Sequence, residues 1–155
     1  MDSGNIGFVL LCAAFVFVMT PGLAMFYGGL VRKKNVVNTM MTSIFIIGIG
    51  IVMWVLFGYS LSFAPSGNAF IGDFRWLGLE GVSLTEGYTD DASIPNMVFS
   101  AFQMMFAVIT PALITGAVAG RMKFKSIFVF TIFWSLIVYY PLAHMVWGQG
   151  GLLGA

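Results

Sequence analysis

The chain has 155 residues, of which 59% are hydrophobic and 8% are charged, and its mean hydropathy is +0.96. An ordinary soluble domain carries roughly 25% charged residues, so this composition nearly excludes a water-soluble fold. A single cysteine, Cys12, rules out an intrachain disulfide and a cysteine-based metal site.

Four long stretches contain no Asp, Glu, Lys or Arg: residues 6–31, 35–72, 92–120 and 126–155. A helix needs about 20 apolar residues to cross the hydrocarbon core, so each stretch is long enough to span a membrane. The expected fold class is all-α, a polytopic bundle of transmembrane helices. We predict helices at residues 5–31, 36–63, 96–120 and 126–146. A cleavable signal peptide is the rival interpretation of the first stretch, but the start lacks a basic n-region and we treat it as a retained span.

The charges predict how these helices are oriented. Six of the seven basic residues lie in the two short connections: Arg32, Lys33, Lys34, Arg121, Lys123 and Lys125. The long loop at residues 64–95 holds five of the six acids. The positive-inside rule places both basic connections in the cytoplasm. We therefore expect a multi-pass protein of the inner cell membrane, with the N-terminus, the long loop and the C-terminal stretch outside.

Three prolines fall within the predicted helices: Pro21, Pro111 and Pro141. Each removes a backbone donor that lipid cannot replace, so neighbouring helices or a polar cavity must satisfy the freed carbonyl groups. This pattern predicts kinked helices around an internal cavity.

No enzyme constellation can be assembled from the helices. Their interiors contain no carboxylate, the chain has one histidine, and no glycine-rich phosphate loop is present. We predict a protein that is not an enzyme, with no cofactor, no bound metal and no nucleic-acid partner. The absence of acids at membrane depth also argues against a carboxylate proton relay or a sodium site in this segment. Any permeant cation must be met by neutral groups.

Neutral groups of that kind lie on the third predicted helix. Phe102, Phe106 and Thr110 follow one another at four-residue steps along one face, with Phe99 before them and Gln103 beside them. On periodicity alone, packing of a phenylalanine-rich helix against lipid or another helix is the favoured interpretation. On the fourth helix, Trp147 is most simply explained as an interfacial belt residue.

Three motifs favour a functional site over simple packing of these aromatic residues. Thr-Pro-Gly-Leu-Ala-Met-Phe-Tyr-Gly-Gly-Leu-Val-Arg-Lys-Lys-Asn occupies residues 20–35, Ala-Phe-Gln-Met-Met-Phe-Ala-Val-Ile-Thr residues 101–110, and Ala-His-Met-Val-Trp-Gly residues 143–148. In this order they resemble the Amt/Mep/Rh ammonium transporter family, and the resemblance covers essentially the whole chain.

The resemblance implies specific roles for residues of this chain. Trp147, Phe102 and Phe106 are expected to recruit ammonium or methylammonium at the outer mouth, with Gln103 as a donor in the vestibule. Tyr27 is expected to line the pore lower down, whereas the family's pore histidines lie beyond this segment, so His144 is expected to have a packing role. The implied mechanism is deprotonation of ammonium at the mouth and passage of ammonia through a hydrophobic pore.

Family members have about eleven helices and associate as trimers. We therefore expect this chain to be an incomplete N-terminal part of the transporter domain, with membrane lipid and a cytoplasmic regulatory protein as further partners and a homotrimer as the full-length assembly. The alternatives are a membrane ammonium sensor and a non-conducting structural membrane subunit.

Overall fold

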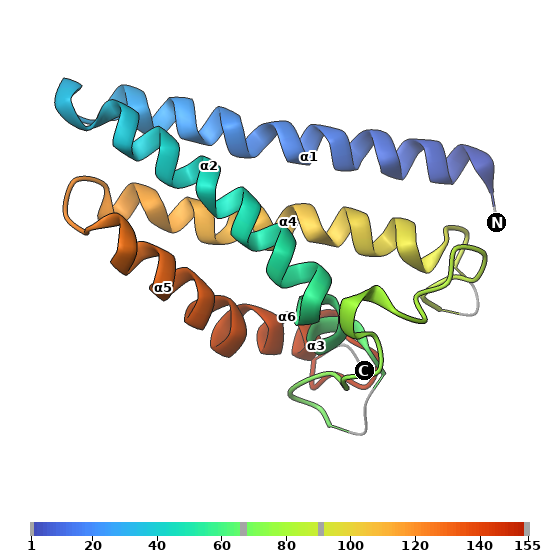
Figure 1. Cartoon of the computed structure of the whole chain (residues 1–155). Helices are drawn as coiled ribbons and strands as arrows, with labels where there is room; N and C mark the ends of the chain where they lie inside the picture. Colours follow the sequence, from blue (N-terminus) through green and yellow to red (C-terminus); the bar gives the residue numbers. More distant parts are fainter. Residues whose placement is uncertain (1, 66–67, 90–91, 154–155) are drawn as a thin grey trace.

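The structure is a computed structural model that describes residues 2–65, 68–89 and 92–153. Within these residues, four helices are long and apolar enough to cross a membrane: Ser3–Leu30, Lys33–Phe63, Asn96–Val118 and Phe124–Trp147. Each helix returns toward the end of the molecule from which the previous one started, and both termini lie at the end that carries the long loop (Figure 1). The predicted all-α fold class is confirmed.

Helix α1 (Ser3–Leu30) starts at an N-cap, because the Asp2 carboxylate accepts a hydrogen bond of 2.9 Å from the backbone N–H of Gly4. The α1 start is also joined to the end of the long loop, where the Asn5 amide donates to the Ser93 hydroxyl over 2.9 Å. A short 3₁₀ turn, Lys33–Asn35, then leads into α2 (Val36–Met53).

Two of the spans are interrupted by a π-helical turn. The second span runs from α2 through the π turn Trp54–Gly58 into α3 (Tyr59–Phe63), and the fourth runs from α5 (Phe124–Trp134) through the π turn Ser135–Tyr139 into α6 (Tyr140–Trp147). Pro141 lies two residues after the second π turn, in the first turn of α6. In one continuous α-helix this position would require the N–H that proline lacks, and the proline ring would press against a carbonyl group. The wider turn relieves both problems within one span.

The core lies where these two interrupted spans meet. Four aromatic side chains there are at most 1% exposed: Trp54, Tyr59, Phe63 and Tyr140. The Trp54 ring lies 5.7 to 6.1 Å from each of the other three, centroid to centroid. Its indole N–H also donates to the Ser100 hydroxyl over 3.3 Å, which joins this core to the third span.

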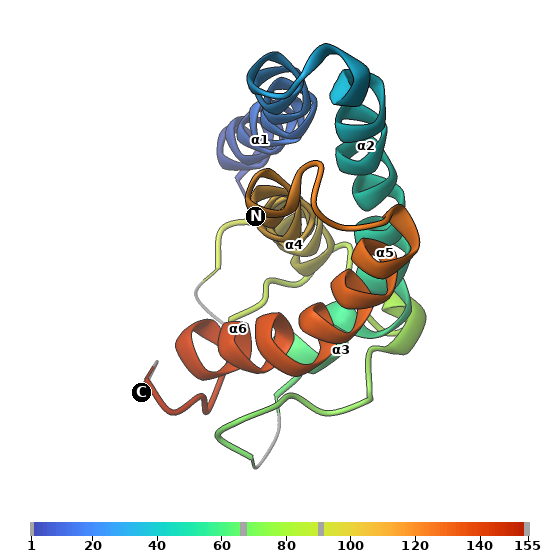
Figure 2. The same cartoon turned by 90° about the vertical axis from the view of Figure 1, so that its left-hand side faces the viewer.

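The third span, α4 (Asn96–Val118), lies at the centre of the bundle. It contacts α1, α2 and α5, and Figure 2 shows these helices around it, with α6 beneath. It ends where Gly120 adopts a φ of +71°, a left-handed conformation that glycine reaches without steric penalty. Pro21 and Pro111 lie inside α1 and α4 without ending either helix.

The long outer loop folds back on the aromatic core. Trp76 stacks on Tyr59 with centroids 5.5 Å apart, and Val82 is buried. Phe70 and Phe74, in contrast, are each more than half exposed. Residues 66–67 and 90–91 of this loop lie outside the described residues.

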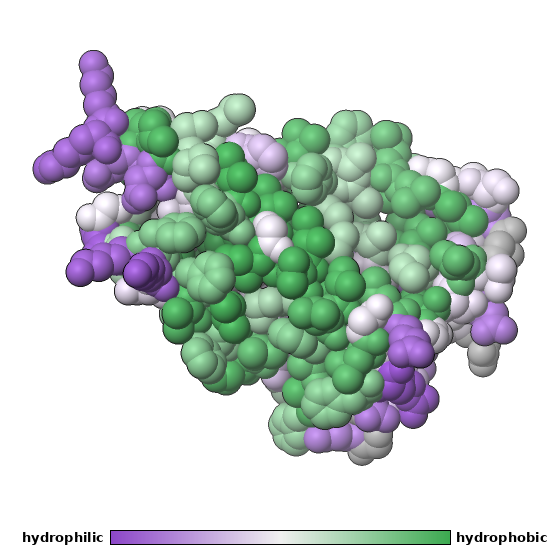
Figure 3. All heavy atoms as spheres, viewed as in Figure 1, coloured by the Kyte–Doolittle hydropathy of each residue, from purple (hydrophilic) through white to green (hydrophobic). Residues whose placement is uncertain are grey.

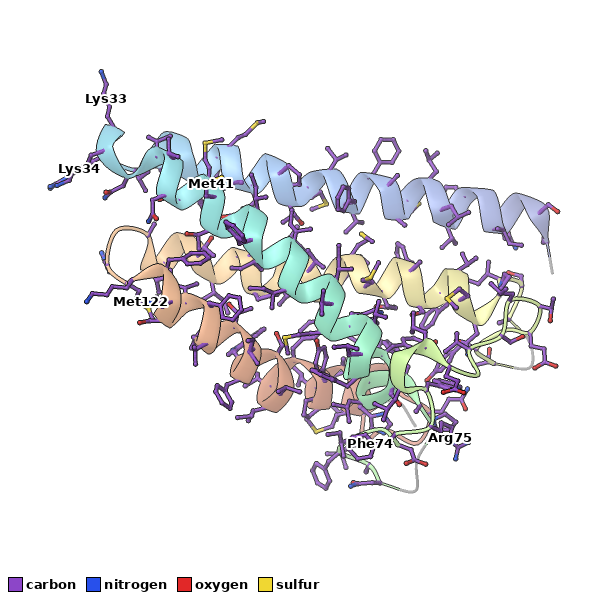
Figure 4. All side chains as sticks on the ribbon, in the orientation of Figure 1. Lys33, Lys34, Met41, Phe74, Arg75 and Met122 are labelled. Atoms are coloured by element: carbon purple, nitrogen blue, oxygen red, sulfur yellow. The ribbon has the colours of Figure 1, made fainter. Side chains whose placement is uncertain are left out.

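The surface shows the polarity that a lipid bilayer requires. On the face shown in Figure 3, apolar residues cover the middle of the bundle and hydrophilic residues gather at its two ends. Lys33, Lys34 and Met122 mark one end in Figure 4, and Phe74 and Arg75 mark the other. The described part of the chain is therefore built as a multi-pass membrane protein.

We predict that Gly58→Ala destabilises the bundle. A Cβ atom at Gly58 would lie 2.7–2.8 Å from ring atoms of Tyr140, which is buried and has no room to move. Overpacking of this kind costs about 1–3 kcal/mol. Thermal unfolding in detergent micelles measures the change.

The matched control is Gly22→Ala, because no atom lies within 4 Å of a Cβ placed there. Alanine is the better helix former by up to about 1 kcal/mol, so this variant should unfold at the same or a higher temperature. Equal melting temperatures for both variants would contradict a packed contact between Gly58 and Tyr140.

Candidate substrate pocket

An aromatic pocket of about 540 Å³ lies between α4 and the fourth span. Four of the residues predicted from the sequence line it together: Phe102, Gln103, Phe106 and Trp147. Its other lining residues are Thr110, Trp134, Val138, Tyr139, Leu142, Ala143 and Val146. The structure thus brings two segments about 40 residues apart in sequence into one site.

The α4 wall of the pocket follows from helical spacing. Phe102 and Phe106 are four residues apart, and their rings meet edge to face with centroids 5.2 Å apart and planes at 77°. Thr110 is one turn further on, but its hydroxyl donates to the Phe106 carbonyl oxygen over 2.6 Å. The hydroxyl proton is therefore used within the helix, and this wall is mainly aromatic.

The opposite wall comes from α5, its π turn and α6. Trp147 stands at the mouth with 59% of its surface exposed. Four-residue steps back from Trp147 reach Ala143 and Tyr139, and a five-residue step across the π turn then reaches Trp134. Neither Trp134 nor Tyr139 was predicted from the sequence as a residue of this site. The face at four-residue spacing was visible in the sequence, but the extra residue of the π turn was not.

The pocket is suited to a small cation without a fixed counter-charge. None of the described residues that line it is Asp, Glu, Lys or Arg. Its polar groups are neutral: an amide on Gln103, hydroxyls on Thr110 and Tyr139, and two indole N–H groups. Aromatic faces attract cations through their ring quadrupole, most strongly for tryptophan. Among the described residues, no cluster of His, Cys, Asp or Glu could hold a metal ion.

Tyr27 lies elsewhere. Its hydroxyl donates to the Leu113 carbonyl oxygen over 3.1 Å, and its ring packs against Gly116 of α4 so closely that a Cβ there would overlap it. In the described structure Tyr27 joins α1 to α4 and does not line the aromatic pocket.

His144 is a structural anchor one turn before Trp147. It is fully buried, and its two ring nitrogens each lie 3.1 Å from a backbone carbonyl oxygen, of Ser62 and of Asn68. Gly148 and Gly151 wrap closely around it, since a side chain on either would overlap His144 atoms. The imidazole therefore ties the end of α6 to α3 and to the outer loop, in agreement with the packing role expected for it.

Two hydrogen bonds between Gln149 and Tyr88 hold the chain just after Trp147. The Gln149 backbone N–H donates to the Tyr88 hydroxyl over 3.0 Å, and the Gln149 amide donates to the Tyr88 carbonyl oxygen over 2.6 Å. Tyr88 in turn stacks on Phe99 with centroids 4.8 Å apart, next to the aromatic wall of α4. Burial raises the pKa of the Tyr88 phenol, while the Gln149 hydrogen bond acts in the opposite direction, so this hydroxyl stays protonated at neutral pH.

The four spans and the charge-free aromatic pocket define a multi-pass membrane protein with a candidate site for a small cation. Residues 7–155 match the model of the Ammonium Transporter Family, and the chain belongs to this family. The resemblance based on the three sequence motifs is confirmed.

Similar proteins support the assignment. The chain is 50% identical to an ammonium transporter of Bacillus subtilis over its whole length, which is 38% of that protein. The crystal structure of Saccharomyces cerevisiae Mep2 aligns with a TM-score of 0.85 and 34% identity over 97% of this chain and 35% of that chain. A structure described as a sensor Amt protein aligns with a TM-score of 0.81 and 26% identity over 96% of this chain and 34% of that chain. The chain therefore spans less than two fifths of the length of these relatives.

We predict that His144→Ala destabilises the protein by about 2–4 kcal/mol, because the buried imidazole loses its hydrogen bonding with the Ser62 and Asn68 carbonyl groups and a cavity opens. Trp147→Ala, three residues along the same helix, removes a larger but mostly exposed side chain and should change stability much less. Unfolding of both variants in detergent, followed by near-UV circular dichroism, measures the difference. A larger loss for Trp147→Ala would overturn this assignment.

Proposed function

We propose that this chain forms the first four helices of a transporter that moves ammonium across the membrane. Membership of the ammonium transporter family supports the substrate class, and the Bacillus subtilis relative is itself named an ammonium transporter. The observation that carries the proposal is the pocket in which Trp147, Phe102 and Phe106 come together without a charged neighbour.

In this proposal Trp147 recruits ammonium from outside. A cation over an aromatic face gains roughly 0.5–2 kcal/mol, and more when it is desolvated. Ammonium also donates hydrogen bonds, which Gln103 and Tyr139 can accept, whereas sodium and potassium have no hydrogen-bond donors. The pocket would thereby favour ammonium without a carboxylate that attracts every cation.

Beyond the mouth, the Phe102 and Phe106 rings oppose the passage of charge. Moving an unpaired cation into an apolar environment is so unfavourable that the group loses its proton instead. Ammonium would therefore release a proton at the mouth, ammonia would continue through the hydrophobic path, and the proton would travel separately. The remaining helices of the whole protein would supply the rest of the path.

The proposed orientation places the pocket mouth outside the inner membrane. It rests on the six basic residues in the α1–α2 and α4–α5 connections, which the positive-inside rule assigns to the cytoplasm. The homotrimer and the cytoplasmic regulatory protein stay predictions.

A membrane sensor is the second candidate, favoured by the structural likeness to the sensor Amt protein. The same pocket would bind ammonium in a sensor. The two functions differ in whether the cation's nitrogen crosses the membrane, so a transport assay separates them.

The proposal predicts the behaviour of Trp147→Leu in transporter-deficient cells that take up radiolabelled methylammonium. The full-length protein that contains this chain should transport, and the variant should need about 2- to 30-fold more methylammonium for half-maximal uptake, which corresponds to the loss of one cation–π contact. The 155-residue chain expressed alone should not transport.

The control is Phe74→Leu, which removes an aromatic ring that is 63% exposed on the outer loop and outside the pocket. Its uptake should equal that of the unmodified protein. Binding of methylammonium without uptake by the full-length protein would favour the sensor. Uptake that Trp147→Leu leaves unchanged would contradict recruitment at this pocket.

A further inference from the structure

A small polar crevice with a free volume of about 10 Å³ lies between α2, α4 and the start of α5. Three buried threonines line it: Thr39 and Thr42 of α2 and Thr115 of α4. Its other lining residues are Asn38, Ala119, Gly120, Met122 and Ile127. Met122 lies at the same end of the bundle as the lysines of the α1–α2 connection (Figure 4). No residue is shared with the aromatic pocket, so the crevice is a separate site.

Two of the three threonine hydroxyls have already used their proton. Thr42 donates to the Asn38 carbonyl oxygen over 2.7 Å, and Thr115 donates to the Ala112 carbonyl oxygen over 2.7 Å. A hydroxyl carries one proton and two lone pairs. The Ser43 hydroxyl, 3.2 Å from that of Thr115, takes up at most one of these lone pairs. Thr42 and Thr115 therefore both remain able to accept a hydrogen bond.

The Thr39 hydroxyl differs from the other two. Its side chain is 4% exposed, and its Oγ1 atom has no hydrogen-bond partner among the described residues. Hydrocarbon cannot supply the missing bond, and burying a hydroxyl without a partner is unfavourable. A buried hydroxyl in this condition, beside a cavity lined by further polar groups, indicates a bound polar molecule.

Size and charge decide which molecule fits. One water needs about 10–15 Å³ of room and two to four polar partners, and the crevice offers that room and three hydroxyls. An anion such as chloride is larger than water. A cation would meet the positive charge of Arg121 and Lys123, which flank Met122, and residues 31–35 and 119–125 hold six basic residues and no acid. Both kinds of ion are therefore disfavoured, and a neutral water is not.

We propose that this crevice binds a single structural water molecule that joins α2 to α4. Thr39 donates to the water oxygen, and the water donates its two protons to the Thr42 and Thr115 hydroxyls. The water thus adds a second polar link beside the direct contact between Ser43 and Thr115. Lipid gives helices no hydrophobic driving force to associate, so polar links of this kind hold the basic end of the bundle together.

Water-edited solid-state NMR of the full-length protein in lipid bilayers tests the site, because magnetisation passes from water to the side chains beside it. Thr39 should gain magnetisation from water, although it is buried. Thr20 is the matched control: it is 1% exposed, its hydroxyl also has no partner among the described residues, and it does not line the crevice. Thr20 should gain none. Equal transfer to both threonines, or no transfer to Thr39, would overturn the proposal.

A pair of valine variants tests the same water through stability. Thr39→Val replaces the hydroxyl by a methyl group of nearly the same shape, so the water loses a partner and the melting temperature of the full-length protein in detergent should fall. Thr20→Val removes a hydroxyl that nothing satisfies, so it should leave the melting temperature unchanged or raise it. Thr39→Ser keeps the hydroxyl and should keep the transfer from water to Thr115.

A Thr39→Val protein that melts at or above the temperature of the unmodified protein would show that the Thr39 hydroxyl binds no water. If Thr39→Val lowers the melting temperature but no magnetisation reaches Thr39 from water, another helix of the full-length protein supplies the partner and the proposal is wrong. The NMR measurement on the unmodified protein decides the matter even if Thr39→Val does not fold. None of these results depends on methylammonium uptake.

Discussion

The close approach of Tyr140 to Gly58 is the contact on which the arrangement of the two interrupted spans depends. The tyrosine ring occupies the space that a side chain at position 58 would fill. Because the buried Trp54 ring contacts the Tyr140 ring of α6 as well as the Tyr59 and Phe63 rings of α3, α3 and α6 are held against one another. In a membrane this matters greatly, since lipid offers helices no hydrophobic driving force to associate and close packing must hold them.

The contact between Tyr140 and Gly58 also positions one wall of the aromatic pocket. Tyr139 precedes Tyr140 and lines the pocket, so the side chain that enters the core and the side chain that faces the site are neighbours on one π-helical junction. At the outer end, His144 and the pair of Tyr88 with Gln149 hold the chain on either side of Trp147. These contacts fix the backbone on both sides of Trp147, so its largely exposed ring is held in place without being buried.

The charged residues of the chain lie apart from the aromatic pocket. Apolar and aromatic groups line the pocket, together with a few neutral hydrogen-bonding groups. Six of the seven basic residues gather in the α1–α2 and α4–α5 connections, none of which lines the pocket.

Sequence by itself determined the spans and the residues of the aromatic pocket that belong to motifs. Lipid satisfies no backbone group, so long charge-free stretches must become helices, and α1, α4 and the two interrupted spans begin and end within a few residues of the predicted positions. Helical spacing placed Phe102 and Phe106 on one face, and family resemblance joined them to Trp147.

Only the tertiary structure decided how those helices meet. It revealed the two π turns, and the second of them shifts the register of the fourth span by one residue and brings Trp134 into the pocket beside Tyr139. It also placed the Tyr27 ring against Gly116 of α4. Local periodicity cannot show these features, because each arises from contacts between segments far apart in the chain, and such contacts depend on how side chains fit together.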